Sequence, residues 1–314
     1  MDAGRRWTDK QLFELEKHLE EIYSQALTEL TEKTNEYFKQ FERLDAEKRK
    51  LLEAGKITKR EYREWRKNKI AMGKHWTAMK ENAAKDLAAV NQHAQEYLNG
   101  KLPEIYAYNY NFNAHEIEGM CGNAITFELA DQQTVRNLIF QGDNPLVPLK
   151  KLDPAKDIPW NMQKINSEVL QGIYQGESIP KIAARLEKVG VDNKVSAVRA
   201  ARTAVTNAEN KARQDAAEKA AEKGVEMGKC WLATHDGRTR EWHLQADYMY
   251  GTSDKAIPID EPFEVDGEDM MYPGDLDGSP ANVYNCRCSY KNVVFGFKST
   301  LPPELRGKIH VEFT

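Results

Sequence analysis

Two cysteines, Cys286 and Cys288, stand one residue apart near the end of the chain, in the stretch CRCSY. Thiolates bind Zn²⁺, and the imidazole of His243 could supply a third ligand, with Asp236 or water as the fourth. If CRC lies on a strand, both sulfur atoms point to the same side, because side chains alternate along a strand. His243, Cys286 and Cys288 are therefore the candidate ligands of a zinc site.

Two other interpretations of the cysteine pair stay open. Structural zinc sites usually combine two separated Cys-x₂-Cys pairs, and this chain has one close pair, so the cysteines could equally be packed core residues. A disulfide between Cys286 and Cys288 would be strained. Four cysteines in 314 residues do not make a disulfide framework.

Three arginines stand among many carboxylates in the same region. Between residues 231 and 285, twelve Asp or Glu face three Lys or Arg. A planar guanidinium binds a carboxylate through two parallel hydrogen bonds. Arg238, Arg240 and Arg287 could therefore tie turns together through nearby acids: Asp236, Asp275 or Glu261. The alternative is a set of surface ion pairs, each of which contributes little.

The region also allows an enzymatic interpretation. His235, Asp236 and His243 could hold a metal ion whose bound water hydrolyses a phosphodiester, which would make the protein a metal-dependent nuclease. The sequence contains no H-E-x-x-H motif, P-loop or nucleophile elbow. Both a structural and an enzymatic class of function therefore follow from the residues.

Short strands and turns are expected around these residues. CWLAT, PFEVDG, DMMYPG and CRCSYKNVVFGF are apolar runs separated by Asp, Gly and Pro turns. An Ala-rich helix should precede them, starting at Asp192 or Asn193 and ending near Lys223, after Gly190 has closed a helix capped by Ser178. Four polar residues of the Ala-rich helix lie along one of its faces: Arg202, Thr206, Asn210 and Arg213. This face either docks on the strands or faces solvent.

Residues 8 to 98 are expected to be almost entirely helical, with Thr8 as the first N-cap. Gly55 should break this helix, and Thr58 should cap the next. Gly100 and Pro103 should end the helical region, and the aromatic residues that follow are expected in an extended or loop conformation.

Two further helices are expected before the Ala-rich one. The first should cover residues 126 to 140. A proline-rich linker then leads to a second helix, which Asp157 and Pro159 should open.

A basic stretch stands inside the N-terminal helical region. From Lys48 to Lys85, thirteen Lys or Arg face four Glu. Clustered cations attract phosphate groups, and Trp65 and Trp76 could add stacking, so DNA is a candidate ligand. An acidic protein partner and a plain solvated helix are the alternatives. The candidate contact residues are Lys59, Arg60, Arg63, Arg66, Lys67, Lys69 and Lys74.

The most specific part of the sequence is the segment from 231 to 288, which carries D-x-R-T-R-x-x-H, Y-P-G-D and N-C-R-C motifs. These motifs resemble those of the phage head morphogenesis proteins typified by the F protein of phage Mu. Upstream, AVRAARTAVTNAENKARQDAA resembles the long helix that precedes the motif in such proteins. The matching motif residues are Asp236, Arg238, Thr239, Arg240, His243, Tyr272, Pro273, Gly274, Asp275, Asn285, Arg287, Cys286 and Cys288.

The resemblance implies an α+β fold, with a long helical N-terminal region followed by a helix-plus-small-β domain. The expected divisions are a long-helix region (1–99), a middle segment and linker (100–156), the Mu F-like domain (157–300, motif core 229–298) and a tail (301–314). The resemblance also implies a minor capsid protein with portal protein and major capsid or scaffold protein as partners, without catalysis.

The sequence contains no segment that is typical of export or of membrane insertion. The first twenty residues lack an apolar core of signal-peptide length, and no run of about 18 apolar residues occurs. Membrane contact is therefore not expected. The expected location is the host cytoplasm during assembly and then the interior of the phage head, near the portal.

Overall fold

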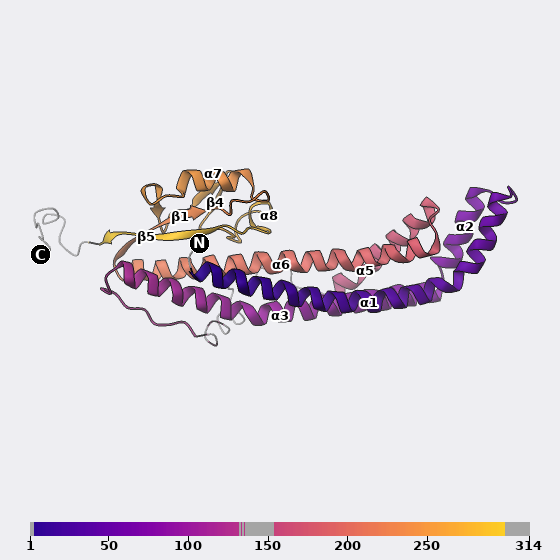
Figure 1. Cartoon of the computed structure of the whole chain (residues 1–314), viewed down its shortest axis with the longest axis horizontal. Helices are drawn as coiled ribbons and strands as arrows, with labels where there is room; N and C mark the ends of the chain where they lie inside the picture. The colour runs from indigo at the N-terminus through magenta and orange to yellow at the C-terminus, as the bar shows by residue number, and fades with distance from the viewer. Residues whose placement is uncertain (1–2, 132, 134, 136–153, 299–314) are drawn as a thin grey trace, which may run out of the picture. The chain divides into compact units, whose positions relative to one another are not determined.

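The computed structural model describes residues 3–298 except 132, 134 and 136–153 (Figure 1). The chain divides into two compact units, one made of Met1–Leu12, Lys101–Pro148 and Arg202–Thr314, the other of Phe13–Gly100 and Leu149–Ala201. Long helices precede small antiparallel sheets along the chain, so the predicted α+β class is confirmed.

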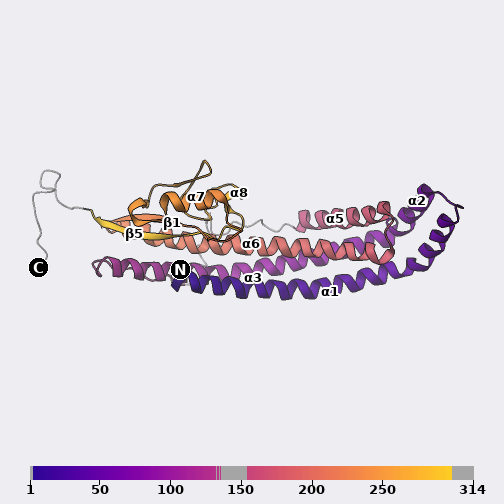
Figure 2. The same ribbon diagram turned by 45° about the horizontal axis from the view of Figure 1, so that its top comes forward.

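The second unit is helical. It contains the larger parts of α1 (Ala3–Glu53) and α3 (Lys74–Met120), all of α2 (Lys59–Ile70) and α5 (Pro154–Gln175), and the beginning of α6 (Ile179–Glu222). Figures 1 and 2 show α1 and α3 running side by side. Apolar side chains from all of these helices form the core, including Leu30, Phe38, Ile70, Trp76, Leu87, Ile165, Val169, Ile182 and Leu186.

The turn between α1 and α2 forms as the sequence predicts. Gly55 has a φ of 67°, which favours glycine, and the N–H groups of Gly55 and Lys56 bond to the carbonyls of Leu52 and Leu51, closing α1. Thr58 then caps α2 through a reciprocal pair of hydrogen bonds with Glu61. Both predicted boundaries are confirmed.

The predicted helix end at Gly190 is wrong, because α6 runs without a break from Ile179 to Glu222. A Cβ atom at Gly190 would lie 2.3 Å from Cδ2 of Leu27 on α1. The glycine therefore allows two helices to approach closely, and the packing outweighs its weak helix propensity of about 1 kcal/mol.

Two predictions about α1 and α3 are also wrong. Thr8 is not an N-cap, since α1 begins at Ala3 and the Thr8 hydroxyl donates to the Gly4 carbonyl inside the helix. Pro103 does not end α3, which continues to Met120 and carries the aromatic run in helical form. Leu102 and Ile105 are fully buried beside Pro103, so packing offsets the lost backbone hydrogen bond.

The helix α5 begins at Pro154, so Asp157 and Pro159 lie within its first turns and not at its start. Residues 124–130 form no helix, which contradicts the first part of the helix expected from 126 to 140. Most of the remainder of that prediction lies outside the described residues.

The first unit combines helix segments with the strands. β1 (Val225–Leu232) pairs antiparallel with β5 (Ser289–Phe297) on one side and with β2 (Ile257–Pro258) on the other, in the order β2-β1-β5. Trp231 faces Tyr290 across the β1–β5 ladder, and Lys229 faces Asn292. Figures 1 and 2 show this sheet lying along the C-terminal part of α6.

The rest of this unit is short elements and turns. β3 (Phe263–Val265) and β4 (Glu268–Met270) form a hairpin whose Asp266 and Gly267 both have positive φ, the requirement of a tight two-residue turn. α7 (Glu241–Tyr250), a 3₁₀ turn (Ser253–Lys255) and α8 (Pro280–Val283) complete it. Trp231, Phe263 and Tyr290 lie at the centre of its core.

No helix among the described residues is long and apolar enough to cross a lipid bilayer.

Candidate functional site

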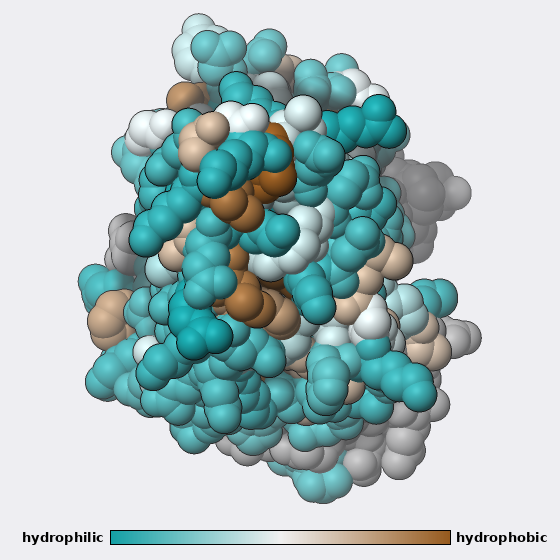
Figure 3. Space-filling view, turned by 90° about the vertical axis from the view of Figure 1, so that its right-hand side faces the viewer, coloured by the Kyte–Doolittle hydropathy of each residue, from teal (hydrophilic) through white to brown (hydrophobic). Residues whose placement is uncertain are grey.

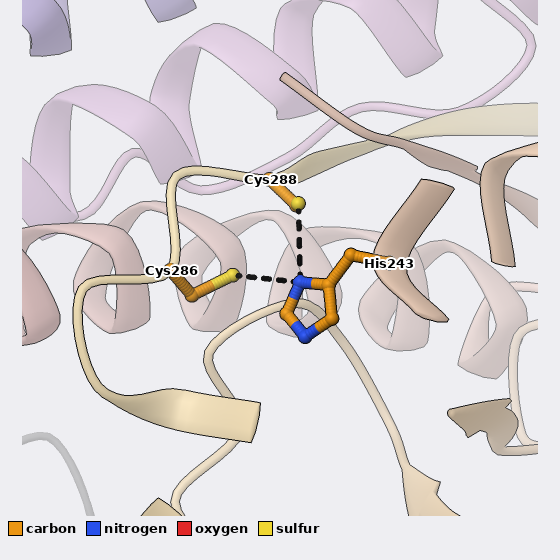
Figure 4. Close-up of side chains that lie close together, drawn as sticks. All are labelled: His243, Cys286 and Cys288. Atoms are coloured by element: carbon orange, nitrogen blue, oxygen red, sulfur yellow. Dashed lines mark hydrogen bonds between the residues drawn. The ribbon is translucent and has the colours of Figure 1, made fainter. Parts of the chain in front are cut away.

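His243, Cys286 and Cys288 come together in the core of the first unit. The Nδ1 atom of His243 lies 3.4 Å from Sγ of Cys288 and 3.7 Å from Sγ of Cys286. The three side chains are at most 2 % exposed. Figure 4 shows both sulfur atoms facing the same ring nitrogen, with the imidazole coming from α7 and the thiols from the loop that leads into β5.

The predicted strand geometry of CRC is wrong, although the convergence is confirmed. β5 begins at Ser289, so both cysteines precede it. Asn285, with a φ of 56°, reverses the chain after α8, and the Cys286 N–H bonds to the Val283 carbonyl. The loop turns both thiols inward and leaves Arg287 to reach outward.

The two thiols interact with each other. All four cysteines are free, so there is no disulfide between Cys286 and Cys288. A hydrogen bond from Cys288 lowers the pKa of the Cys286 thiol, and the same bond together with burial raises the pKa of Cys288. The hydrogen bond between the thiols therefore couples the ionisation of the two cysteines.

Arg287 binds Asp236 through two of its nitrogens, one at 2.8 Å from Oδ1. The carboxylate also accepts from the N–H of Arg238 and the hydroxyl of Thr239. The Arg287 guanidinium is the main cause that holds the pKa of Asp236 well below its usual value. One bidentate link thus joins the loop before β5 to the turn before α7.

The other predicted arginine contacts differ from this one. Arg238 is a largely exposed ion-pair partner of Asp236, at 3.6 Å, so the pair contributes little. Arg240 donates to the Tyr284 carbonyl. The Asp275 carboxylate accepts hydrogen bonds from the backbone N–H groups of Met271 and Asp277.

The Y-P-G-D turn lies against α6. Gly274 has a φ of 81°, and a Cβ atom there would lie 3.1 Å from Cγ2 of Thr206. The Pro273 and Gly274 carbonyls accept from Asn210 and Asn207, at 2.8 and 3.1 Å. The turn therefore needs glycine both for its backbone and for its approach to the helix.

The predicted polar face of the Ala-rich helix docks on the motif segment. Thr206 donates to the Cys286 carbonyl at 2.7 Å, Asn210 to the Cys288 carbonyl at 3.0 Å, and Arg213 to the Tyr290 carbonyl. Each of these three side chains donates to a backbone carbonyl, which offsets part of the cost of burying a polar group. The hydroxyl of Thr203 accepts from the Asn285 N–H at 3.2 Å.

The candidates taken from the sequence do not include several site residues, among them Asn207, Arg5 and Lys229. Asn207, one position after Thr206, also faces the motif turns. Arg5, at the start of α1, forms a buried ion pair with Glu209 and donates to the Arg287 carbonyl. Lys229 is fully buried in β1 and donates to the Ile259 and Met271 carbonyls. Of these, only Asn207 could have been identified from the sequence, because its helical spacing places it beside Thr206 and Asn210. The partners of Arg5 and Lys229 are distant in sequence.

The residues of the enzymatic interpretation do not converge. His235 pairs with Asp247 at 3.0 Å, Asp236 is engaged by Arg287, and His243 faces the thiols. Within the described part of the chain, the one group of three or more potential ligand side chains found is His243, Cys286 and Cys288. The geometry therefore favours a metal site made of these three and not a surface hydrolytic centre.

The basic residues of the N-terminal region divide into two groups. Arg66 is fully buried, pairs with Asp45 at 3.0 Å and donates to the Glu177 carbonyl at 2.6 Å, so it is not a surface contact. Trp76 is buried as well, which removes it as a stacking platform. Lys67 is half-buried, and the exposed members are Lys59, Arg60, Arg63, Lys69 and Lys74. Figure 3 shows a mainly hydrophilic face at the α2 end.

Comparisons with known proteins match part of the chain. The chain is 31% identical over 144 residues to the NAD(+)--arginine ADP-ribosyltransferase EFV of Enterococcus faecalis (strain ATCC 700802 / V583). The match covers 46% of this chain, and the chain spans only 27% of the length of that relative. No solved structure matches the chain.

A family model described as phage Mu protein F like protein matches residues 163–291. The match begins in α5, includes all of α6 and ends in β5, so it contains both the docking face of α6 and the three motifs. Residues 163–291 are therefore similar to the phage Mu protein F like family, and this similarity supports a role in phage head morphogenesis.

Proposed function

We propose that this protein is a minor capsid protein of a tailed phage, which binds the portal and the inner capsid while the head is assembled. The family match over residues 163–291 is the observation that carries the proposal. The protein then acts by binding and not by catalysis, in the host cytoplasm at first and afterwards inside the head near the portal.

The first unit has the properties of a docking module. Its turns are fixed by hydrogen bonds from α6, so its surface keeps one arrangement without a partner. Two large apolar side chains on α7 stay exposed, Tyr248 at 78 % and Met249 at 41 %. Exposed apolar groups on a rigid element favour protein contact, and we assign the portal contact to this end of α7.

Co-migration with the portal protein of the same phage on a sizing column tests this assignment. The full chain is expected to elute with portal oligomers at micromolar concentration. Tyr248→Ser combined with Met249→Ser should weaken the complex at least tenfold, since each truncated anchor costs on the order of 1 kcal/mol or more.

The matched control combines Phe13→Ser with Val195→Ser, which removes exposed apolar groups from α1 and α6. The control should leave the complex intact. Absence of any complex with the unaltered chain would contradict portal binding, whereas an equal loss in both double variants would contradict the assignment to α7.

The exposed cations of α2 support a second contact, with packaged DNA. Lys59, Arg60, Arg63 and Lys69 are all exposed on this one short helix. Phosphate attraction requires only clustered cations and is independent of base sequence. DNA contact would accompany portal binding and needs no enzymatic step.

A further inference from the structure

The distances among three buried ligand atoms match those of a metal centre. Tetrahedral zinc with one imidazole and two thiolates sets nitrogen and sulfur about 3.5 Å apart, because Zn–N is about 2.0 Å and Zn–S about 2.3 Å. The observed separations from Nδ1 of His243 are 3.4 and 3.7 Å. We propose that His243, Cys286 and Cys288 bind one Zn²⁺, with water as the fourth ligand.

The amide of Asn282 determines which nitrogen of His243 is available. Its Nδ2 donates to the Val265 carbonyl at 3.2 Å and to the Glu268 carboxylate at 2.9 Å. The Oδ1 atom therefore lies toward the ring, 3.3 Å from Nε2 of His243. An amide oxygen can only accept, so Nε2 carries the hydrogen and Nδ1 presents its lone pair to both sulfur atoms.

This arrangement is the one that zinc-binding histidines use. The nitrogen remote from the metal donates to a protein oxygen, which fixes the ring orientation and strengthens the ligand nitrogen. Asn282 is itself held by a third contact, since Nε1 of Trp242 donates to Oδ1 at 2.6 Å. Asn282, which orients the His243 ring, is therefore held by hydrogen bonds of its own and is only 1 % exposed.

Charge and burial favour zinc with a structural role. One Zn²⁺ and two thiolates sum to zero net charge, so the centre can lie in an apolar core without an uncompensated ion. Trp231 packs edge-on against the His243 ring, with centroids 5.5 Å apart. Because the ligands are at most 2 % exposed, a nucleic acid cannot reach the ion. The ion would instead fasten α7 to the loop before β5.

The test is elemental analysis of the full chain, purified with reductant and without chelator. A zinc-to-protein ratio near unity is expected. Cys288→Ser should lose the zinc, because a serine hydroxyl is a poor ligand for Zn²⁺. Cys230→Ser is the matched control: Cys230 is equally buried but donates to the Thr252 carbonyl, a bond that serine can keep, so this variant should retain the metal.

Cobalt reconstitution of the unaltered chain keeps the test independent of how the variants fold. Co²⁺ in this site should give a thiolate charge-transfer band in the near ultraviolet and tetrahedral bands in the visible. Removing zinc with a chelator should lower the melting temperature. Zinc well below stoichiometry without a thiolate–cobalt band would overturn the proposal, and so would equal zinc loss in the Cys230→Ser control.

Discussion

Lys229 is a fully buried lysine in β1, and its burial changes its pKa. Its ammonium lies in β1 with two carbonyl acceptors, over the ring of Phe263 at 5.1 Å. Burial lowers the pKa of Lys229 to about 8. A buried lysine of this kind satisfies two backbone carbonyls and at neutral pH carries a charge that the core disfavours.

Stability should therefore depend on pH through Lys229. The unfolded lysine has a pKa of about 10.4, so between about pH 8 and 10.4 the unfolded chain holds a proton that the folded chain has lost. The contribution of Lys229 to the free energy of unfolding consequently rises with pH in this window, by on the order of 2–3 kcal/mol. Below about pH 8, Lys229 is protonated in the folded chain, so burial of its charge lowers the free energy of unfolding by the full amount.

The measurement compares the unaltered chain with Lys229→Met by urea unfolding from pH 7 to 10. The difference in free energy of unfolding should grow in favour of the unaltered chain as the pH rises. Lys291→Met, at an exposed lysine of β5, is the matched control and should give a flat difference. A flat difference for Lys229→Met as well would show that burial does not perturb this lysine.

At the scale of elements, polar side chains fasten helices to other parts of the chain. On α6, Thr206 and Asn210 bond to carbonyls of the motif turns. On α2, Arg66 pairs with Asp45 of α1, and the Tyr62 hydroxyl donates to the same carboxylate at 2.8 Å. These contacts specify where each helix lies, which apolar packing alone does less selectively.

Arg66→Ala should therefore be strongly destabilising. Removing Arg66 takes the closest cation from the buried Asp45 carboxylate and leaves it Arg49 at 3.7 Å and the Tyr62 hydroxyl, at a cost of up to about 3–5 kcal/mol. Arg63→Ala, about one turn earlier on the exposed side of α2, should change stability by less than about 0.5 kcal/mol. Urea unfolding of both variants measures this, and similar midpoints would contradict the buried position of Arg66.

At the scale of the whole molecule, charge is segregated along a chain of net charge -4. Cations gather on α2, and carboxylates gather around the motif segment. A small net charge therefore coexists with a local basic surface on α2, and within the described residues this surface is where we expect phosphate groups to be attracted.

Gel retardation with duplex DNA tests the basic surface. Binding should be micromolar or weaker, insensitive to sequence, and lost steeply as salt rises. Lys59→Glu, Arg63→Glu and Lys69→Glu together should abolish the shift. The same charge reversal at exposed lysines of α6, Lys181, Lys188 and Lys219, is the control. An equal loss in both triple variants would mean that net charge alone, and not α2, attracts DNA.

Local sequence patterns were sufficient to predict the α1–α2 boundary and the helix face that docks on the motif turns, whereas the fold class was expected from the resemblance of the motifs. Local signals carry these: Gly55 and Thr58 act on their own neighbours, and the spacing of Thr206, Asn210 and Arg213 places them on one helix face. Local patterns could not predict that α3 passes Pro103 and α6 passes Gly190, because packing between distant segments outweighs local helix propensity. The tertiary structure decided that Arg66 is buried and that Asn282 orients His243, since such contacts join residues that no local pattern connects.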